Sequence, residues 1–81
     1  MKKNLYVVKI YRTSVDNKEI CRLYCEGNDP VVVGVRVRAV LIANYNFKEL
    51  DLNPESLYFR SYKVDEKDAK IIRKFCTVCE W

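Results

Sequence analysis

The residues of this chain that are best able to do chemistry are four cysteines, which occur as two close pairs, Cys21-x3-Cys25 and Cys76-x2-Cys79. Four thiolates in two pairs are a typical ligand set for zinc. The first pair falls in a segment with strand character, where residues four apart lie about 13 Å from each other and cannot share one ion. The second pair is predicted on the apolar side of a helix end, where thiols behave as small hydrophobic groups and lack the electropositive surroundings of redox cysteines. We therefore expect structural thiols, and the alternative is a zinc site formed by Cys21, Cys25, Cys76 and Cys79.

No catalytic set is recognisable among the remaining residues. The chain has no histidine, which excludes serine and cysteine triads and histidine switches. Its two glycines, Gly27 and Gly34, do not provide the repeated glycines of a phosphate-binding loop. The eleven carboxylates fall largely in predicted turns, caps and strand ends, without a pair arranged for acid–base chemistry. The sequence thus predicts a protein that is not an enzyme and that needs no cofactor.

Basic and aromatic side chains form a second group, because they alternate with apolar ones in three predicted strands. Alternate residues of a strand point to opposite faces of a sheet. The set that shares one face, here named the tyrosine–arginine face, contains Lys9, Tyr11, Arg22, Tyr24, Tyr58, Arg60 and Tyr62. Rings and cations on a sheet can stack bases and neutralise phosphates, and both residue types are enriched in protein–protein hot spots. The face is therefore a candidate binding site for a protein, for RNA or for a protein that carries RNA; the alternative is an ordinary solvated face, since tyrosine favours strands.

A further basic group is predicted on the polar side of the last helix. This secondary basic patch consists of Lys67, Lys70, Arg73 and Lys74. The net charge of +4 favours an acidic partner, although only mildly.

The longest apolar run, Val31–Ala43, decides the architecture around which these residues are placed. Asp29 is a good N-cap and Pro30 suits the first helical position, so we predict a helix from about Pro30 to Tyr45. The alternative is a strand over Val31–Val37, where valine alternates with glycine or arginine.

The remaining periodicities predict strands at about residues 5–13, 19–26 and 57–64 and a second helix over Asp65–Glu80, capped by Asp65. The fold class is therefore α+β, a single 81-residue domain in β-β-α-β-α order. We expect a three-stranded antiparallel sheet of order 2-1-3, with both helices packed on one face. That covered face comprises Tyr6, Val8, Ile10, Cys21, Leu23, Cys25, Leu57 and Phe59, and the second helix presents Ile71, Ile72, Phe75, Cys76 and Cys79 to it. The tyrosine–arginine face is left open.

Two features bear on the location of the protein in the cell. No segment is long enough to span a membrane, and the N-terminal apolar run is too short for a secretory signal because Lys9 interrupts it. We expect a cytoplasmic protein, with reduced thiols and no membrane partner.

In size, order of elements, the Met1-Lys2-Lys3 start and the lack of a catalytic set, the chain resembles the small accessory proteins that tailed bacteriophages make early in infection. The resemblance extends over the whole chain but assigns no site residue. It implies an inhibitor that binds and disables a bacterial defence, toxin or nuclease protein, which can be bound to RNA, in the cytoplasm of the host cell. The alternative function is a module that binds RNA or single-stranded nucleic acid directly. A homodimer is also left open, because a short sheet with exposed edges can pair with its copy.

Overall fold

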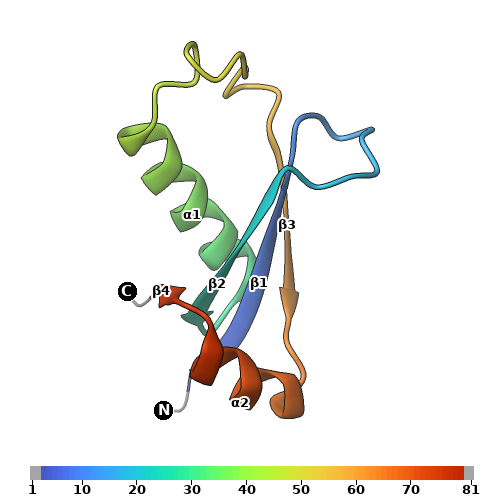
Figure 1. The fold of residues 1–81 in the computed structure, drawn as a ribbon, viewed down its shortest axis with the longest axis vertical. Helices are drawn as coiled ribbons and strands as arrows, with labels where there is room; N and C mark the ends of the chain where they lie inside the picture. Colours follow the sequence, from blue (N-terminus) through green and yellow to red (C-terminus); the bar gives the residue numbers. More distant parts are fainter. Residues whose placement is uncertain (1–2, 80–81) are drawn as a thin grey trace.

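A computed structural model describes residues 3–79 of the chain and shows one sheet and two helices (Figure 1). The elements follow one another as β1 (Asn4–Tyr11), β2 (Cys21–Gly27), α1 (Pro30–Asn44), β3 (Tyr58–Lys63), α2 (Glu66–Phe75) and β4 (Val78–Cys79). The predicted α+β class is confirmed. The strand order is β3-β1-β2-β4, with β1 antiparallel to both of its neighbours and β4 parallel to β2. The order of the first three strands agrees with the prediction, but the prediction of a three-stranded, wholly antiparallel sheet is wrong, because β4 adds a parallel strand.

Helix α1 begins at the predicted residue and settles the helix-or-strand alternative. The Asp29 carboxylate accepts hydrogen bonds from the backbone N–H of Val31 at 2.8 Å and of Val32 at 3.4 Å. Such a cap stabilises a helix by about 1 kcal/mol, and Pro30 occupies a position where no donor is needed. These start signals and the 15-residue length outweigh the poor helix propensity of valine. The strand alternative for residues 31–37 is therefore wrong.

The main core lies between α1 and one face of the sheet. Val33 and Val37 of the helix, each 1% exposed, pack with Tyr6, Val8 and Ile10 of β1. Cys25 and Leu57 complete the buried cluster. Each fully buried valine contributes on the order of 1.5 kcal/mol through the area that it removes from water. The face predicted to be covered is thus covered by α1, except at Cys21, which is exposed.

Helix α2 is shorter than predicted and ends at Phe75. Residues 76–79 leave the helix, and Val78 and Cys79 pair with β2; Glu80 lies outside the described residues. The outer edge of β2 offers unpaired backbone groups to this segment, and the β-branched residues Thr77 and Val78 favour an extended chain, which outweighs helical periodicity. Asp65 occupies the N-cap position as predicted, although its side chain makes no capping hydrogen bond.

The two helices do not cover the same face of the sheet, contrary to the prediction. Leu5, which lies on the side of β1 opposite the main core, is buried with Ala69 of α2, and the two line one small depression. Strand β3 ends at this end of the sheet, and the N–H of the next residue, Val64, donates to the Leu5 carbonyl at 2.9 Å. Helix α2 starts two residues after Val64. Helix α2 therefore lies across the end of the sheet where β1 begins (Figure 1). Its supposed apolar side is largely in solvent: Phe75 is 77% exposed.

No helix within residues 3–79 has the length and apolar character that crossing a membrane requires.

Candidate functional site

The strand register brings the seven residues of the tyrosine–arginine face together in three rows. In the middle row, Lys9 of β1 is directly opposite Arg22 of β2 and Arg60 of β3. The flanking rows pair Tyr11 with Tyr58, and place Tyr24 and Tyr62 on the two sides of Val7. Three cations, each on its own strand, thus form one line across the sheet between two rows of tyrosines.

The tyrosine rings hold two of these cations by cation–π contacts. The guanidinium carbon of Arg60 lies 5.0 Å from the centre of the Tyr11 ring and 5.2 Å from that of Tyr58. The Lys9 ammonium lies 5.5 Å from the centre of the Tyr62 ring. Contacts of this kind contribute about 0.5–1 kcal/mol each near a surface. The rings therefore restrain the positions of the cations.

The electrostatics of the middle row are unbalanced. Like charges directly opposite each other on neighbouring strands destabilise a sheet. Arg22 is neutralised by Glu19, which accepts from its Nε at 2.9 Å and from its Nη2. No carboxylate among residues 3–79 pairs with Lys9 or with Arg60. Lys9 and Arg60 thus contact tyrosine rings and form no ion pair within residues 3–79, so an anion from outside would be favoured beside them.

The four tyrosines of the face differ in their exposure. Tyr58 and Tyr62, both on the edge strand β3, are 40% and 47% exposed. Tyr11 is only 7% exposed and Tyr24 is half-buried. The face is therefore open along β3 and partly enclosed toward β2.

Helix α2 turns the enclosed part of the face into a groove of about 390 Å³. Its floor includes Lys9, Arg22 and Tyr24, and one wall is formed by Ile71 and Ile72. Ile71 is 58% exposed at the rim, and Asp65 and Asp68 also line the groove, so it combines cationic, acidic and apolar surface. The sequence reasoning missed this wall because it placed α2 on the other face. The available signal was the pair of apolar residues on that face near the start of β1, which needed a cover.

The secondary basic patch does not act as one unit. Arg73 pairs with Glu26, whose Oε1 lies 3.2 Å from the Arg73 Nε, and the Lys74 ammonium lies 5.9 Å from the centre of the Phe75 ring. Lys67 and Lys70 are exposed on α2. Arg73 thus serves to fasten α2 to β2.

Cys21 and Cys25 lie on strand β2 as predicted, but Cys76 follows the end of α2 and Cys79 lies on strand β4, so the prediction of a helical position for this second pair is wrong. Cys25 and Cys79 are register partners on the parallel strands β2 and β4, whereas Cys21 and Cys76 are exposed. Burial, together with the neighbouring thiol of Cys79, raises the pKa of Cys25 to about 12. Burial, and to a lesser extent the charge of Glu19, also raises the pKa of Cys21. Within residues 3–79, no three side chains of His, Cys, Asp or Glu come together as a metal site would require.

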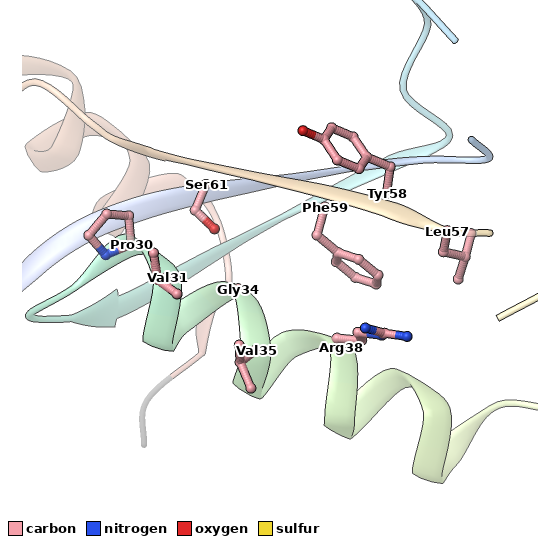
Figure 2. A pocket seen from close by; sticks show the side chains of 9 residues that line it. All are labelled: Pro30, Val31, Gly34, Val35, Arg38, Leu57, Tyr58, Phe59 and Ser61. Atoms are coloured by element: carbon pink, nitrogen blue, oxygen red, sulfur yellow. The ribbon is translucent and has the colours of Figure 1, made fainter. Parts of the chain in front are cut away.

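A second groove, which the sequence did not predict, lies between α1 and β3 and has a volume of about 430 Å³ (Figure 2). Phe59 and Ser61 point from β3 toward α1, whereas Tyr58 points to the opposite side of the sheet. A Cβ atom built on Gly34 would lie 2.8 Å from the Ser61 Oγ. Glycine at this position therefore allows α1 to approach the edge strand closely.

Comparison of the chain with protein-family models, with curated proteins and with solved structures found no match.

Proposed function

We propose that this chain is a non-catalytic binding protein that covers the working surface of an acidic partner with its tyrosine–arginine face. The observation that carries the proposal is the row Arg60–Lys9–Arg22, in which adjacent cations lie directly opposite each other on three strands. Such a row lowers the stability of the sheet. Carboxylates or phosphates of a partner would remove this repulsion, and the tyrosine rings already hold the charges in place for them.

A protein surface fits the face better than a run of nucleic-acid bases. The two exposed rings, Tyr58 and Tyr62, lie about 13 Å apart along β3, whereas successive stacked bases are about 3.4 Å apart. The apolar groove wall of Ile71 and Ile72 stands beside the cations. Tyrosine, arginine and apolar surface side by side are typical of the centre of a protein–protein interface.

The resemblance to small bacteriophage accessory proteins extends the proposal to the target. On that basis the partner is a bacterial nuclease, toxin or defence protein in the cytoplasm of the host, with or without its RNA. The mechanism is occlusion: the protein denies the partner access to its own substrate and performs no chemistry on it.

A pull-down from bacterial lysate with a paired charge reversal tests this proposal. The variant Arg22→Glu/Arg60→Glu changes two residues of the tyrosine–arginine face and lowers the net charge of the whole chain from +4 to 0. The variant Arg36→Glu/Lys48→Glu makes the same change at exposed positions elsewhere and serves as the matched control. We expect the first variant to lose the partner and the control to retain it, both before and after ribonuclease treatment.

Two results would contradict the proposal. Retention of the same partner by a folded Arg22→Glu/Arg60→Glu variant would show that the tyrosine–arginine face does not bind the partner. Tight binding to bare RNA that weakens steeply with salt, together with loss of every captured protein after ribonuclease, would favour the RNA-binding module instead.

A further inference from the structure

The outer edge of β3 has unpaired backbone groups in the described part of the chain, because the strand order is β3-β1-β2-β4. The bond from the Val64 N–H to the Leu5 carbonyl fixes which residues of β3 bond to β1. In an antiparallel ladder these residues alternate, so Tyr58, Arg60 and Tyr62 direct their backbone groups to β1. Phe59, Ser61 and Lys63, three alternate residues of β3, therefore direct their N–H and C=O groups to the open edge.

The first two turns of α1 beside this edge are apolar and unpaired, and the exposed Arg38 follows them at the far end of the groove. Val31 and Val35, four residues apart and so on one side of the helix, are 71% and 62% exposed. Both line the groove between α1 and β3, together with Phe59 (Figure 2). A helix that covers a sheet normally has a polar outer side. The open strand edge and the exposed valines thus form one continuous flank of the molecule.

We propose that this flank is the interface with a second copy of the chain, in which β3 pairs antiparallel with β3 of the other copy about a two-fold axis at Ser61. In this register the outward residues meet as Ser61 with Ser61 and Phe59 with Lys63 of the second copy, and each such pair exchanges two hydrogen bonds. Arg60 comes to lie opposite Tyr62 of the second copy. Like charges are therefore not directly opposite across the axis, and every side chain stays on its own face of the sheet.

The position of α1 in each copy agrees with this arrangement. Among the strands, α1 packs most extensively on β3, and Gly34 brings it close to that strand. If the helix axis lies half a strand spacing inside the edge, the two α1 helices are about 10 Å apart, a common interaxial distance for packed helices. Val31 and Val35 of each copy then lie between the two helices, and the groove of about 430 Å³ is filled.

The area of the flank agrees with a weak dimer. Helix α1 has 15 residues and is about 22 Å long, and the helix and sheet layers together are about 20 Å thick. The flat projection is about 440 Å² per copy, or about 900 Å² in total, which is just below the roughly 1,000 Å² of a stable biological interface and is therefore in the range of weak, transient association. We expect a dissociation constant of roughly 10–100 µM. The dimer would form one continuous eight-stranded sheet with both tyrosine–arginine faces on the same side.

Sedimentation velocity of the full chain over roughly 5–500 µM brackets this affinity. We expect a monomer–dimer equilibrium that strengthens with salt, because two copies of charge +4 repel each other. Val35→Glu should weaken the dimer at least tenfold, whereas Val15→Glu, at a residue that is 83% exposed and does not line this groove, should not. A chain that stays monomeric throughout, or a dimer that Val35→Glu leaves unchanged, would overturn the proposal.

Amide exchange of the unmodified chain gives a second measurement that needs no variant. The N–H groups of Phe59, Ser61 and Lys63 should gain protection as the concentration rises. Dimerisation without that gain would mean that the copies associate by another surface and would refute the β3 pairing. The salt response separates this interface from the proposed function, because binding of an acidic partner weakens with salt whereas the dimer strengthens.

Discussion

Replacing Lys9 by glutamate should make the protein more stable while it abolishes binding of an acidic partner. The substitution converts the row Arg60–Lys9–Arg22 into a carboxylate between two guanidinium groups. Most substitutions in a folded protein destabilise it. A gain in stability from a non-conservative change at a half-buried strand residue would therefore identify the cationic row as a feature that folding alone does not favour.

The expected size of the gain follows from the contacts of Lys9. A directly opposite charge pair changes stability by about 0.2–1 kcal/mol, and reversal of sign opposite Arg60 gains about 1 kcal/mol. The contact with Arg22 adds little, because Glu19 already neutralises that side chain. The cation–π contact of Lys9 with Tyr62 is lost, which costs about 0.5 kcal/mol. The net gain is about 0.5 kcal/mol, equivalent to roughly 2–4 °C in Tm for a domain of this size.

Urea unfolding at low and high salt measures this difference. At high ionic strength the Debye length falls to about 3 Å, so the stability advantage of Lys9→Glu should shrink or vanish. Lys9→Gln, which removes the charge without reversing it, should lie between the two proteins. The reasoning about the row would be refuted if Lys9→Glu lowered the free energy of unfolding by more than about 1 kcal/mol. It would also be refuted if the stability difference between the variant and the unmodified protein did not depend on salt concentration.

Three further predictions concern the core. Gly27→Ala should destabilise by about 1–3 kcal/mol in urea unfolding, because its Cβ would lie 2.4 Å from the Cγ2 of Val33, which is itself buried. Val37→Ala should cost about 2 kcal/mol and Val35→Ala less than about 0.5 kcal/mol, since the two valines are 1% and 62% exposed; equal costs would contradict this packing of α1. The buried Cys25, with its pKa raised from 9.0 to about 12, stays protonated in the folded protein where the unfolded chain ionises, so stability should fall as pH rises from about 9 toward 12. Cys25→Ser should flatten that part of the pH profile, and an unchanged profile would count against the assignment.

The parts of the fold that the sequence predicted depend on local signals. Asp29 and Pro30 mark the start of α1 by chemistry that acts within one helical turn. The alternation of β1, β2 and β3 assigned residues to the correct sides of the sheet, and register then assembled the tyrosine–arginine face from three strands. The face was predictable as a set of residues because a period of two requires no knowledge of how the strands pair.

The parts that the sequence did not predict depend on distant segments. Residues 76–79 have helical periodicity, but the free edge of β2 captures Val78 and Cys79 as a strand. The position of α2 depends on Leu5, an apolar residue 60 positions upstream of the Asp65 that precedes the helix. The cationic row itself required the register, since the opposition of Lys9 to both arginines cannot be read from alternation. The groove wall of Ile71 and Ile72 was missed because α2 was expected on the other face of the sheet.

The short strand β4 has a consequence for the kinetics of the molecule. Tyr24 of β2 pairs with Val78 of β4, 54 residues later in the chain, so this contact closes a long loop for the gain of only two strand residues. Such a strand should detach more often than the rest of the sheet. Each detachment would remove Cys79, which covers Cys25 on the β4 side, and so open a path to this otherwise inaccessible thiol. The rate at which a thiol reagent labels Cys25 should therefore report how often β4 detaches. Substitutions in β4 that leave the stability against global unfolding unchanged should increase this labelling rate.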